Sequence, residues 1–231
     1  IMGAGGVQTI MNVFGIKPGE RALTVGSGNV GLIISYQLLQ AGVEVAAIVE
    51  AAPRIGGWLV HAAKIRRYGV PILVSHTVKR AWGKDRIEGA TIVRLDEHWR
   101  EVPGTEQNIE CDLMLLAVGL NPSSELLMQF GCDLRWIREL GGLTALRTKY
   151  LETTVSGVFV AGDVSGIEEA TTAMLEGRIA GLSAAMKVRG PVKEAIEERE
   201  RLLVYLEKYR ESPVLARTRE GIKKALIEES P

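Results

Sequence analysis

The chain has 231 residues, of which 46% are apolar, and its 28 basic and 28 acidic side chains cancel in net charge. This apolar fraction is typical of a globular protein, and the length allows one or two domains with sizeable cores. A net charge of zero without a basic stripe argues against nucleic acid or an anionic membrane as a partner. No apolar run reaches the roughly 20 residues that span a bilayer, and no signal peptide is recognisable.

The two cysteines, Cys111 and Cys132, form neither a disulfide framework nor a metal-binding knuckle. They favour a reducing, cytoplasmic location, and we expect both thiols to be buried among apolar side chains. The three histidines are too dispersed for a metal site or a Ser-His-Asp set, so we predict no metal. The chain opens at Ile1 rather than Met, which suggests that it is part of a longer polypeptide.

The first third of the chain alternates between strand and helix patterns. Residues 1–20 read as a glycine-rich loop, a short helix over 7–14 and a Lys-Pro-Gly turn. Beyond them we predict strands over 21–25, 43–50 and 71–74 and helices over 29–40 and 58–68. The almost continuous apolar run of 43–50 indicates that helices cover both faces of its sheet, with a right-handed crossover between the strands.

The rest of the chain is more varied. Residues 77–82 and 86–95 alternate like antiparallel strands, and a polar stretch follows to Glu110. Further on we predict strands over 113–118 and 158–161 and helices over 123–130 and 170–187. The tail, 191–231, mixes both signs of charge and suits two amphipathic helices separated at Ser212-Pro213, a solvated cap or an oligomer contact.

A glycine turn joins the first predicted strand to the helix that follows it. It consists of Gly26, Ser27, Gly28, Asn29, Val30 and Gly31. In a GxGxxG turn of this kind, the first glycine permits the tight reversal and the second lets a pyrophosphate approach the backbone. The third lets helix and strand pack closely, while the helix N-terminus offers N–H groups to the phosphates. The bland alternative is a turn whose glycines serve packing alone.

Glu50 ends the second predicted strand, about 20 residues beyond the turn, where an acidic residue accepts hydrogen bonds from ribose hydroxyls. Such a carboxylate repels a 2′-phosphate, so NAD(H) is favoured over NADP(H), although Arg54 nearby keeps NADP(H) open. Gly56-Gly57-Trp58 follows this strand and is a candidate border of the same site, with packing as the alternative role for Trp58.

A second signature lies at Val158–Asp163, an apolar run that ends on Gly162-Asp163 before a helix rich in small residues. With the first turn, it resembles the two-dinucleotide-binding flavoproteins, the pyridine nucleotide–disulfide oxidoreductase superfamily. The resemblance implies FAD and NAD as cofactors, with Asp163 on a ribityl hydroxyl. It also implies cofactor contacts from Gly119, Gly162 and the backbone of Ala170, Thr171 and Thr172.

Within that superfamily, Met2–Gln8 and the lack of a redox cysteine pair are most similar to the FAD/NAD subunits of amine and opine oxidoreductases. These include the sarcosine oxidase, archaeal-type proline dehydrogenase and hydrogen cyanide synthase types. Three features of relatives are missing here: an N-terminal GxGxxG element for the ADP half of FAD, a Cys-x-x-Cys pair and a Cys-rich iron–sulfur segment. The resemblance therefore implies only part of an FAD domain.

The predicted fold class is α/β, with a Rossmann-like NAD-binding domain, the C-terminal part of an FAD-binding Rossmann-like domain and a helical tail. The predicted domains are a linker or partial FAD-domain segment (1–20), the NAD-binding domain (21–120), the FAD-domain part (121–190) and the charged tail (191–231).

The resemblance implies an oxidoreductase that transfers hydride between nicotinamide and flavin, coupled to amine or imino-acid oxidation. No residue stands out as an acid or base, which fits a reaction whose chemistry belongs to the cofactors. Expected partners are a small-molecule substrate or electron acceptor, and a subunit that supplies the substrate site or the missing FAD half. The alternatives are an NADH:acceptor reductase of ferredoxin- or disulfide-reductase type and a non-catalytic dinucleotide-binding or assembly module.

Overall fold

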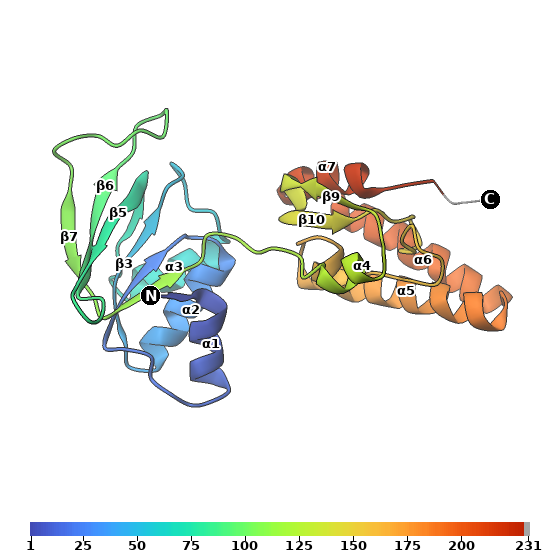
Figure 1. Cartoon of the computed structure of the whole chain (residues 1–231), viewed down its shortest axis with the longest axis horizontal. Coiled ribbons are helices and arrows are strands. Elements are labelled where there is room, and N and C mark those ends of the chain that lie inside the picture. Colours follow the sequence, from blue (N-terminus) through green and yellow to red (C-terminus); the bar gives the residue numbers. More distant parts are fainter. Residues whose placement is uncertain (229–231) are drawn as a thin grey trace. The chain divides into compact units, whose positions relative to one another are not determined.

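The computed structural model describes residues 1–228 and divides the chain into two compact units, Ile1–Val118 and Gly119–Pro231 (Figure 1). The first unit contains a five-stranded sheet in the order β1-β8-β2-β3-β4, in which all neighbouring strands are parallel. Its strands are β1 (Met2–Gly3), β2 (Arg21–Val25), β3 (Glu44–Glu50), β4 (Ile72–Val74) and β8 (Leu113–Leu116). The chain runs outward from β2 to β4 and returns on the other side of β2, so the end of β2 lies where the strand order reverses. In open α/β sheets this switch point is where ligands bind.

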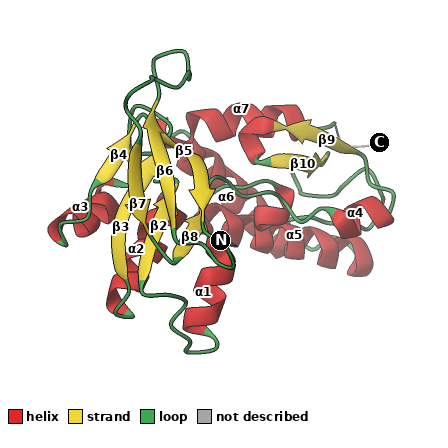
Figure 2. Ribbon diagram, turned by 60° about the vertical axis from the view of Figure 1, so that its left-hand side comes forward, coloured by secondary structure: helices red, strands yellow, loops and turns green. Residues whose placement is uncertain are grey.

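Both faces of this sheet are buried, but by different layers (Figure 2). One face packs against the helices α1 (Ala4–Asn12), α2 (Asn29–Gln40) and α3 (Leu59–Arg67). The other packs against an antiparallel sheet of β5 (His76–Trp82), β6 (Gly89–Arg94) and β7 (Gln107–Glu110). The prediction of helices on both faces is therefore wrong for one of them. An apolar run reports burial, and it does not distinguish a covering helix from a covering sheet.

Two short strands in the first unit escaped the sequence patterns. β1 pairs with β8, with Met2 opposite Leu115, and α1 begins at Ala4 instead of residue 7. β7 completes the antiparallel sheet inside the stretch that reads as polar, since only one of its four residues, Ile109, is less than exposed. A two-residue strand and a strand with a solvated face carry too little alternation to be recognised.

The second unit is built on helices and one hairpin. Its elements are α4 (Glu125–Gln129), β9 (Leu134–Ile137), β10 (Gly142–Ala145), α5 (Ala170–Arg189), α6 (Lys193–Arg210) and α7 (Ala216–Ala225). β9 and β10 pair antiparallel across a 3₁₀ turn that ends at Gly141, whose φ of +92° suits glycine. The sequence patterns indicate the Gly141-Gly142 turn but not the strands around it.

The strand predicted over 158–161 does not form. Phe159 makes a single antiparallel bridge to Glu152, and the backbone N–H of Val160 donates to the carbonyl of Leu151 over 2.9 Å. Among residues 1–228 no further strand lies beside this extended segment. An apolar run reads as a strand whether or not a partner strand is at hand, which is the reason for the error.

The charged tail forms both predicted helices, and they belong to the core of the second unit. Leu202, Leu203 and Leu206 of α6 are buried against α5, and Ile222 of α7 packs on the hairpin region at Ile137. The tail is thus more than a solvated cap, because each helix has one apolar face that the unit buries. In the part of the chain that the structure describes, no helix is both long enough and apolar enough to cross a bilayer.

Candidate functional site

The glycine turn lies between β2 and α2, at the point where the strand order reverses. Gly26 has a φ of +103°, and a Cβ atom there would lie 2.3 Å from the carbonyl oxygen of Ala117. A Cβ atom on Gly31 would lie 2.2 Å from the carbonyl oxygen of Gly26. Both glycines are therefore required by the close packing of the turn against β8 and α2.

Gly28 is different, because a Cβ atom there would meet nothing within 4 Å. Gly28 is also the N-cap of α2, where no side chain caps the helix and no acidic residue lies in the first turn. The N–H groups at the start of a helix carry partial positive charge and bind anions. The turn thus combines an open approach to the backbone with an uncapped helix N-terminus, which is what a pyrophosphate requires. Asn29 and Val30 supply backbone N–H groups here, while the Val30 side chain packs into the core.

Glu50 at the end of β3 holds the turn from the other side. Its Oε2 accepts hydrogen bonds from the backbone N–H of Ser27 (2.8 Å) and the Ser27 hydroxyl (2.7 Å). Its Oε1 accepts one from the backbone N–H of Ala52 (2.8 Å). An ionised carboxylate offers about four acceptor positions. One position on Oε1 therefore remains for a ligand hydroxyl.

The segment after β3 folds back on the same turn. The backbone N–H groups of Gly56 and Gly57 donate to the Oγ (3.1 Å) and carbonyl oxygen (2.8 Å) of Ser27. The Trp58 N–H donates to Asn29 Oδ1 (2.8 Å). A Cβ atom on Gly57 would lie 3.0 Å from the backbone nitrogen of Asn29, so only glycine allows this approach without displacement. The segment borders the candidate site, while Arg54 within it is exposed.

These observations fit the dinucleotide expected from the sequence. The open side of Gly28 and the start of α2 suit the pyrophosphate, and Glu50 suits a ribose hydroxyl. A 2′-phosphate would meet the same carboxylate, which supports the predicted preference for NAD(H). Gly119 begins the second unit with a φ of +147°, and its cofactor contact remains a prediction.

In the second unit, Gly162 and Asp163 open a 3₁₀ turn, Gly162–Ser165. The Gly162 N–H donates to Glu176 Oε2 (2.9 Å), and the Ser165 hydroxyl donates to the same oxygen (2.6 Å). Asp163 is exposed, as is Ala170 at the start of α5. The turn is held firmly from behind and leaves the Asp163 carboxylate accessible. The contact between Asp163 and a flavin remains a prediction.

Thr171 and Thr172 continue the first turn of α5. Thr171 is half-buried, whereas Thr172 is fully buried. The Thr172 hydroxyl donates to the carbonyl of Glu169 (2.7 Å) and accepts from the Glu169 N–H (3.2 Å). Its side chain thus closes the helix N-terminus, so only the backbone of this turn is left to face a ligand.

Glu176 belongs to a buried ion cluster that the sequence patterns did not reveal. Its Oε1 lies 2.6 Å from Arg210 Nη2 and 3.5 Å from Arg147 Nη2. Arg210 also binds Glu168, with 3.0 Å between its Nε and Glu168 Oε2. Burial by itself would raise the pKa of Glu176, but the two guanidinium groups outweigh it and hold the pKa below its usual value. One signal was available: Glu176 falls on the same helical face as Leu175 and Ile179.

Residues 5–177 match the family described as pyridine nucleotide-disulphide oxidoreductase. The chain belongs to this family. Its members are FAD- and NAD(P)-dependent oxidoreductases, which confirms the predicted family, enzyme class and cofactor class at that level. The predicted α/β, Rossmann-like fold class is also confirmed. The redox disulfide in the family's name has no counterpart in the described residues, where Cys111 and Cys132 are buried free thiols.

Two relatives are named as components of larger enzymes. The chain is 27% identical over 207 residues to the opine oxidase A-type polypeptide of Rhizobium meliloti, covering 83% of this chain and 45% of the relative. It is 27% identical over 224 residues to hydrogen cyanide synthase subunit HcnB of Pseudomonas aeruginosa, covering 90% of this chain and 48% of the relative. The chain therefore spans about half the length of these curated relatives.

Solved structures show the same fold. Thioredoxin reductase of T. acidophilum superposes with a TM-score of 0.62 at 24% identity, covering 73% of this chain and 53% of that one. An FAD-dependent pyridine nucleotide-disulphide oxidoreductase from Desulfovibrio vulgaris gives 0.58 at 19% identity, covering 79% and 46% of the two chains. At such identities the likeness establishes the fold alone.

Proposed function

We propose that the chain binds NAD(H) in its first unit and supplies a flavin-facing part in its second unit. The complete enzyme would transfer hydride between nicotinamide and flavin. The observation that carries this proposal is the turn itself, with an open Gly28, an uncapped α2 and one remaining acceptor position on Glu50. The two cofactors supply the redox chemistry when bound.

The protein's own residues bind and orient. Backbone N–H groups at the start of α2 hold the pyrophosphate, and Glu50 accepts a hydrogen bond from a ribose hydroxyl. In the second unit, Asp163 accepts a hydrogen bond from a ribityl hydroxyl. The first turn of α5 places N–H groups near a ring that gains negative charge.

For the substrate we propose an amine or imino acid, oxidised at a site that a partner subunit completes. The names of two relatives, from an opine oxidase and from a hydrogen cyanide synthase, support this class. The second GxGxxG turn expected for the ADP half of FAD is not found in this sequence. We therefore expect the chain alone to bind NADH without retaining stoichiometric FAD.

Titration of the purified chain with NADH and NADPH, followed by calorimetry, tests the proposal. NADH should bind, and NADPH should bind at least about tenfold more weakly because its 2′-phosphate faces Glu50. Gly28→Val should abolish binding by closing the approach to the turn. Gly3→Val is the matched control, because Gly3 is likewise an extended N-cap with open space around it. Failure of NADH to bind, or a preference for NADPH, would contradict the proposal.

The catalytic part is tested separately by following NADH oxidation with artificial acceptors, with and without added FAD and the partner subunit. Turnover that requires FAD supports the oxidoreductase. NADH binding without turnover after the missing half is supplied would support a non-catalytic dinucleotide-binding module instead.

A further inference from the structure

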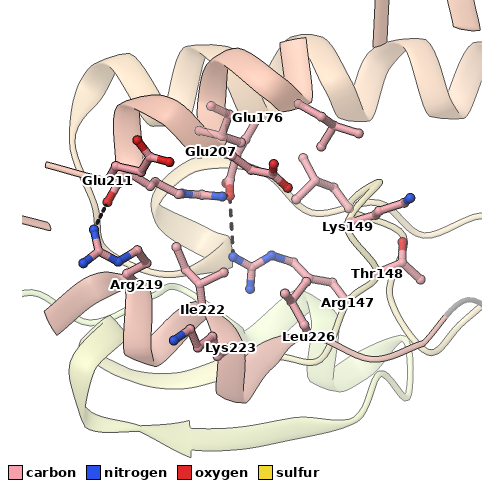
Figure 3. A pocket seen from close by; sticks show the side chains of 14 residues that line it. Arg147, Thr148, Lys149, Glu176, Glu207, Glu211, Arg219, Ile222, Lys223 and Leu226 are labelled. Carbon is pink, nitrogen blue, oxygen red and sulfur yellow. Dashed lines mark hydrogen bonds and ion pairs between the residues drawn. The ribbon is translucent and has the colours of Figure 1, made fainter. Parts of the chain in front are cut away.

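A cavity of about 340 Å³ lies within the second unit, among α6, α7 and the segment that follows β10 (Figure 3). Aliphatic side chains form much of its wall, among them Leu203 and Leu206 of α6 and Ile222 of α7. Its size and its apolar wall with a few charged groups are typical of sites for small organic ligands. All of its lining residues belong to the second unit, so it is separate from the glycine turn after β2.

Arg147 is the charged group that points to a ligand. Its side chain lines the cavity and is 2% exposed, and its Nη2 forms the ion pair with Glu176 drawn in Figure 3. Its other terminal nitrogen, Nη1, is buried and has no hydrogen-bond partner among the described residues. A buried N–H group without an acceptor costs folding free energy, and native proteins nearly always satisfy such groups. A ligand oxygen in the cavity would remove that cost.

The charges around Arg147 limit what this ligand can be. Arg147 and Arg210 are balanced by Glu168 and Glu176, so the buried cluster is neutral as it stands. A doubly charged anion would be repelled by the two carboxylates. A cation would find no acceptor at Arg147, because a guanidinium group only donates. A single carboxylate is compatible with one unsatisfied guanidinium N–H, and an aliphatic chain attached to it fits the leucine wall.

We propose that this cavity binds a small aliphatic monocarboxylate. The carboxylate accepts a hydrogen bond from Arg147 Nη1, and the chain lies against Leu203, Leu206 and Ile222. The ligand joins α7 to α6 through one polar and several apolar contacts, so binding also stabilises the packing of the tail helices. This ligand is independent of NAD(H), whose proposed site lies in the other unit.

Calorimetry and thermal unfolding of the full chain with a series from butanoate to octanoate test the proposal. Hexanoate should bind with one-to-one stoichiometry and raise the melting temperature. Each added methylene should tighten binding about fourfold until the cavity is full. Hexylamine and inorganic phosphate should leave both readings unchanged. Hexanamide should bind at least about tenfold more weakly, because hydrogen bonds from a guanidinium group to a charged acceptor are the stronger ones.

Matched variants locate the site without disturbing the ion cluster. Leu226 lines the cavity and is 43% exposed, so Leu226→Trp should narrow the cavity and weaken hexanoate binding at least about tenfold. Val204→Trp is the control, because Val204 is 66% exposed on α6 and does not line the cavity. Absence of hexanoate binding, equal binding of hexanamide, or unchanged binding in Leu226→Trp would each overturn the proposal. NADH binding, measured on the same samples, reports separately on the proposed function.

Discussion

Two carboxylates, one in each unit, hold a glycine turn with the same pair of donors. Oε2 of Glu50 accepts from the backbone N–H and the hydroxyl of Ser27, at 2.8 and 2.7 Å. Oε2 of Glu176 accepts from the Gly162 N–H and the Ser165 hydroxyl, at 2.9 and 2.6 Å. In each case one oxygen, one backbone donor and one serine fix the backbone of the turn.

The other oxygen of each carboxylate has different surroundings. Oε1 of the half-buried Glu50 accepts from the Ala52 N–H and can take one hydrogen bond more. Oε1 of Glu176 is buried against Arg147 and Arg210. The first carboxylate is thus suited to a ligand that comes and goes, and the second to permanent structure. This difference between the two units can be measured.

The largest effect should come from Glu176→Gln. The change leaves Arg147 and Arg210 in a buried place with only Glu168 to balance them, and breaking a buried ion cluster costs about 3–5 kcal/mol. Urea unfolding followed by circular dichroism measures this loss in the second unit. NADH binding by the first unit should survive. A loss under about 1 kcal/mol would show that the cluster is solvated and that the comparison of the two carboxylates does not hold.

The same variant predicts a dependence on pH. Because the pKa of Glu176 is held below its usual 4.5 in the folded chain, its ionised form adds stability above that value. That stability is lost as the pH falls through the lower, folded-state pKa. The difference in unfolding free energy between the wild type and Glu176→Gln should therefore be full at neutral pH and shrink below 4.5. A difference that grows on acidification would contradict this sign.

A pair of glycine variants separates the structural and ligand-facing parts of the first turn. A Cβ atom on Gly31 would lie 2.2 Å from the Gly26 carbonyl, so Gly31→Ala should cost roughly 1–3 kcal/mol through forced displacement. Gly28→Ala meets open space and should stay within about 0.5 kcal/mol of the wild type in stability. Thermal unfolding of both variants gives the comparison. Equal destabilisation would mean that Gly28 is also a packing glycine.

The contrast between the units also explains which features the sequence predicted. The turn after β2 was predictable because Gly26, Gly31 and Glu50 are fixed by local geometry at regular spacing. The Glu176 cluster was not, because its partners Arg147 and Arg210 come from distant parts of the chain. Nothing in a local pattern distinguishes a tail arginine that turns inward from one that is solvated.

Strands without a full set of neighbours form the other limit. β9 and β10 have exposed positions, such as Trp136, that hide their alternation, and β1 is two residues long. The run at 158–161 has the opposite problem, since it is apolar enough for a strand and finds only a bridge at Phe159. Apolar patterns report burial, whereas a strand also needs hydrogen-bond partners that the pattern does not contain.

The smallest effect should come from Glu50→Gln. A glutamine has one carbonyl oxygen in place of two carboxylate oxygens, so it can hold Ser27 or Ala52 but not both. Losing one of these hydrogen bonds should cost about 0.5–1.5 kcal/mol of stability, well below the expected loss for Glu176→Gln. NADH should bind more weakly and NADPH should be excluded less strictly, because the charge that repels its 2′-phosphate is gone.

Glu44→Gln is the matched control for that change, since Glu44 lies on the same strand in an exposed ion pair with Arg21 (2.8 Å). Exposed pairs contribute little, so both stability and cofactor binding should stay close to the wild type. If Glu50→Gln destabilises the chain as much as Glu176→Gln, then Glu50 is a structural carboxylate with no acceptor to spare. Unfolding curves and NADH titrations of the three variants together decide whether the two turns differ in purpose or only in their surroundings.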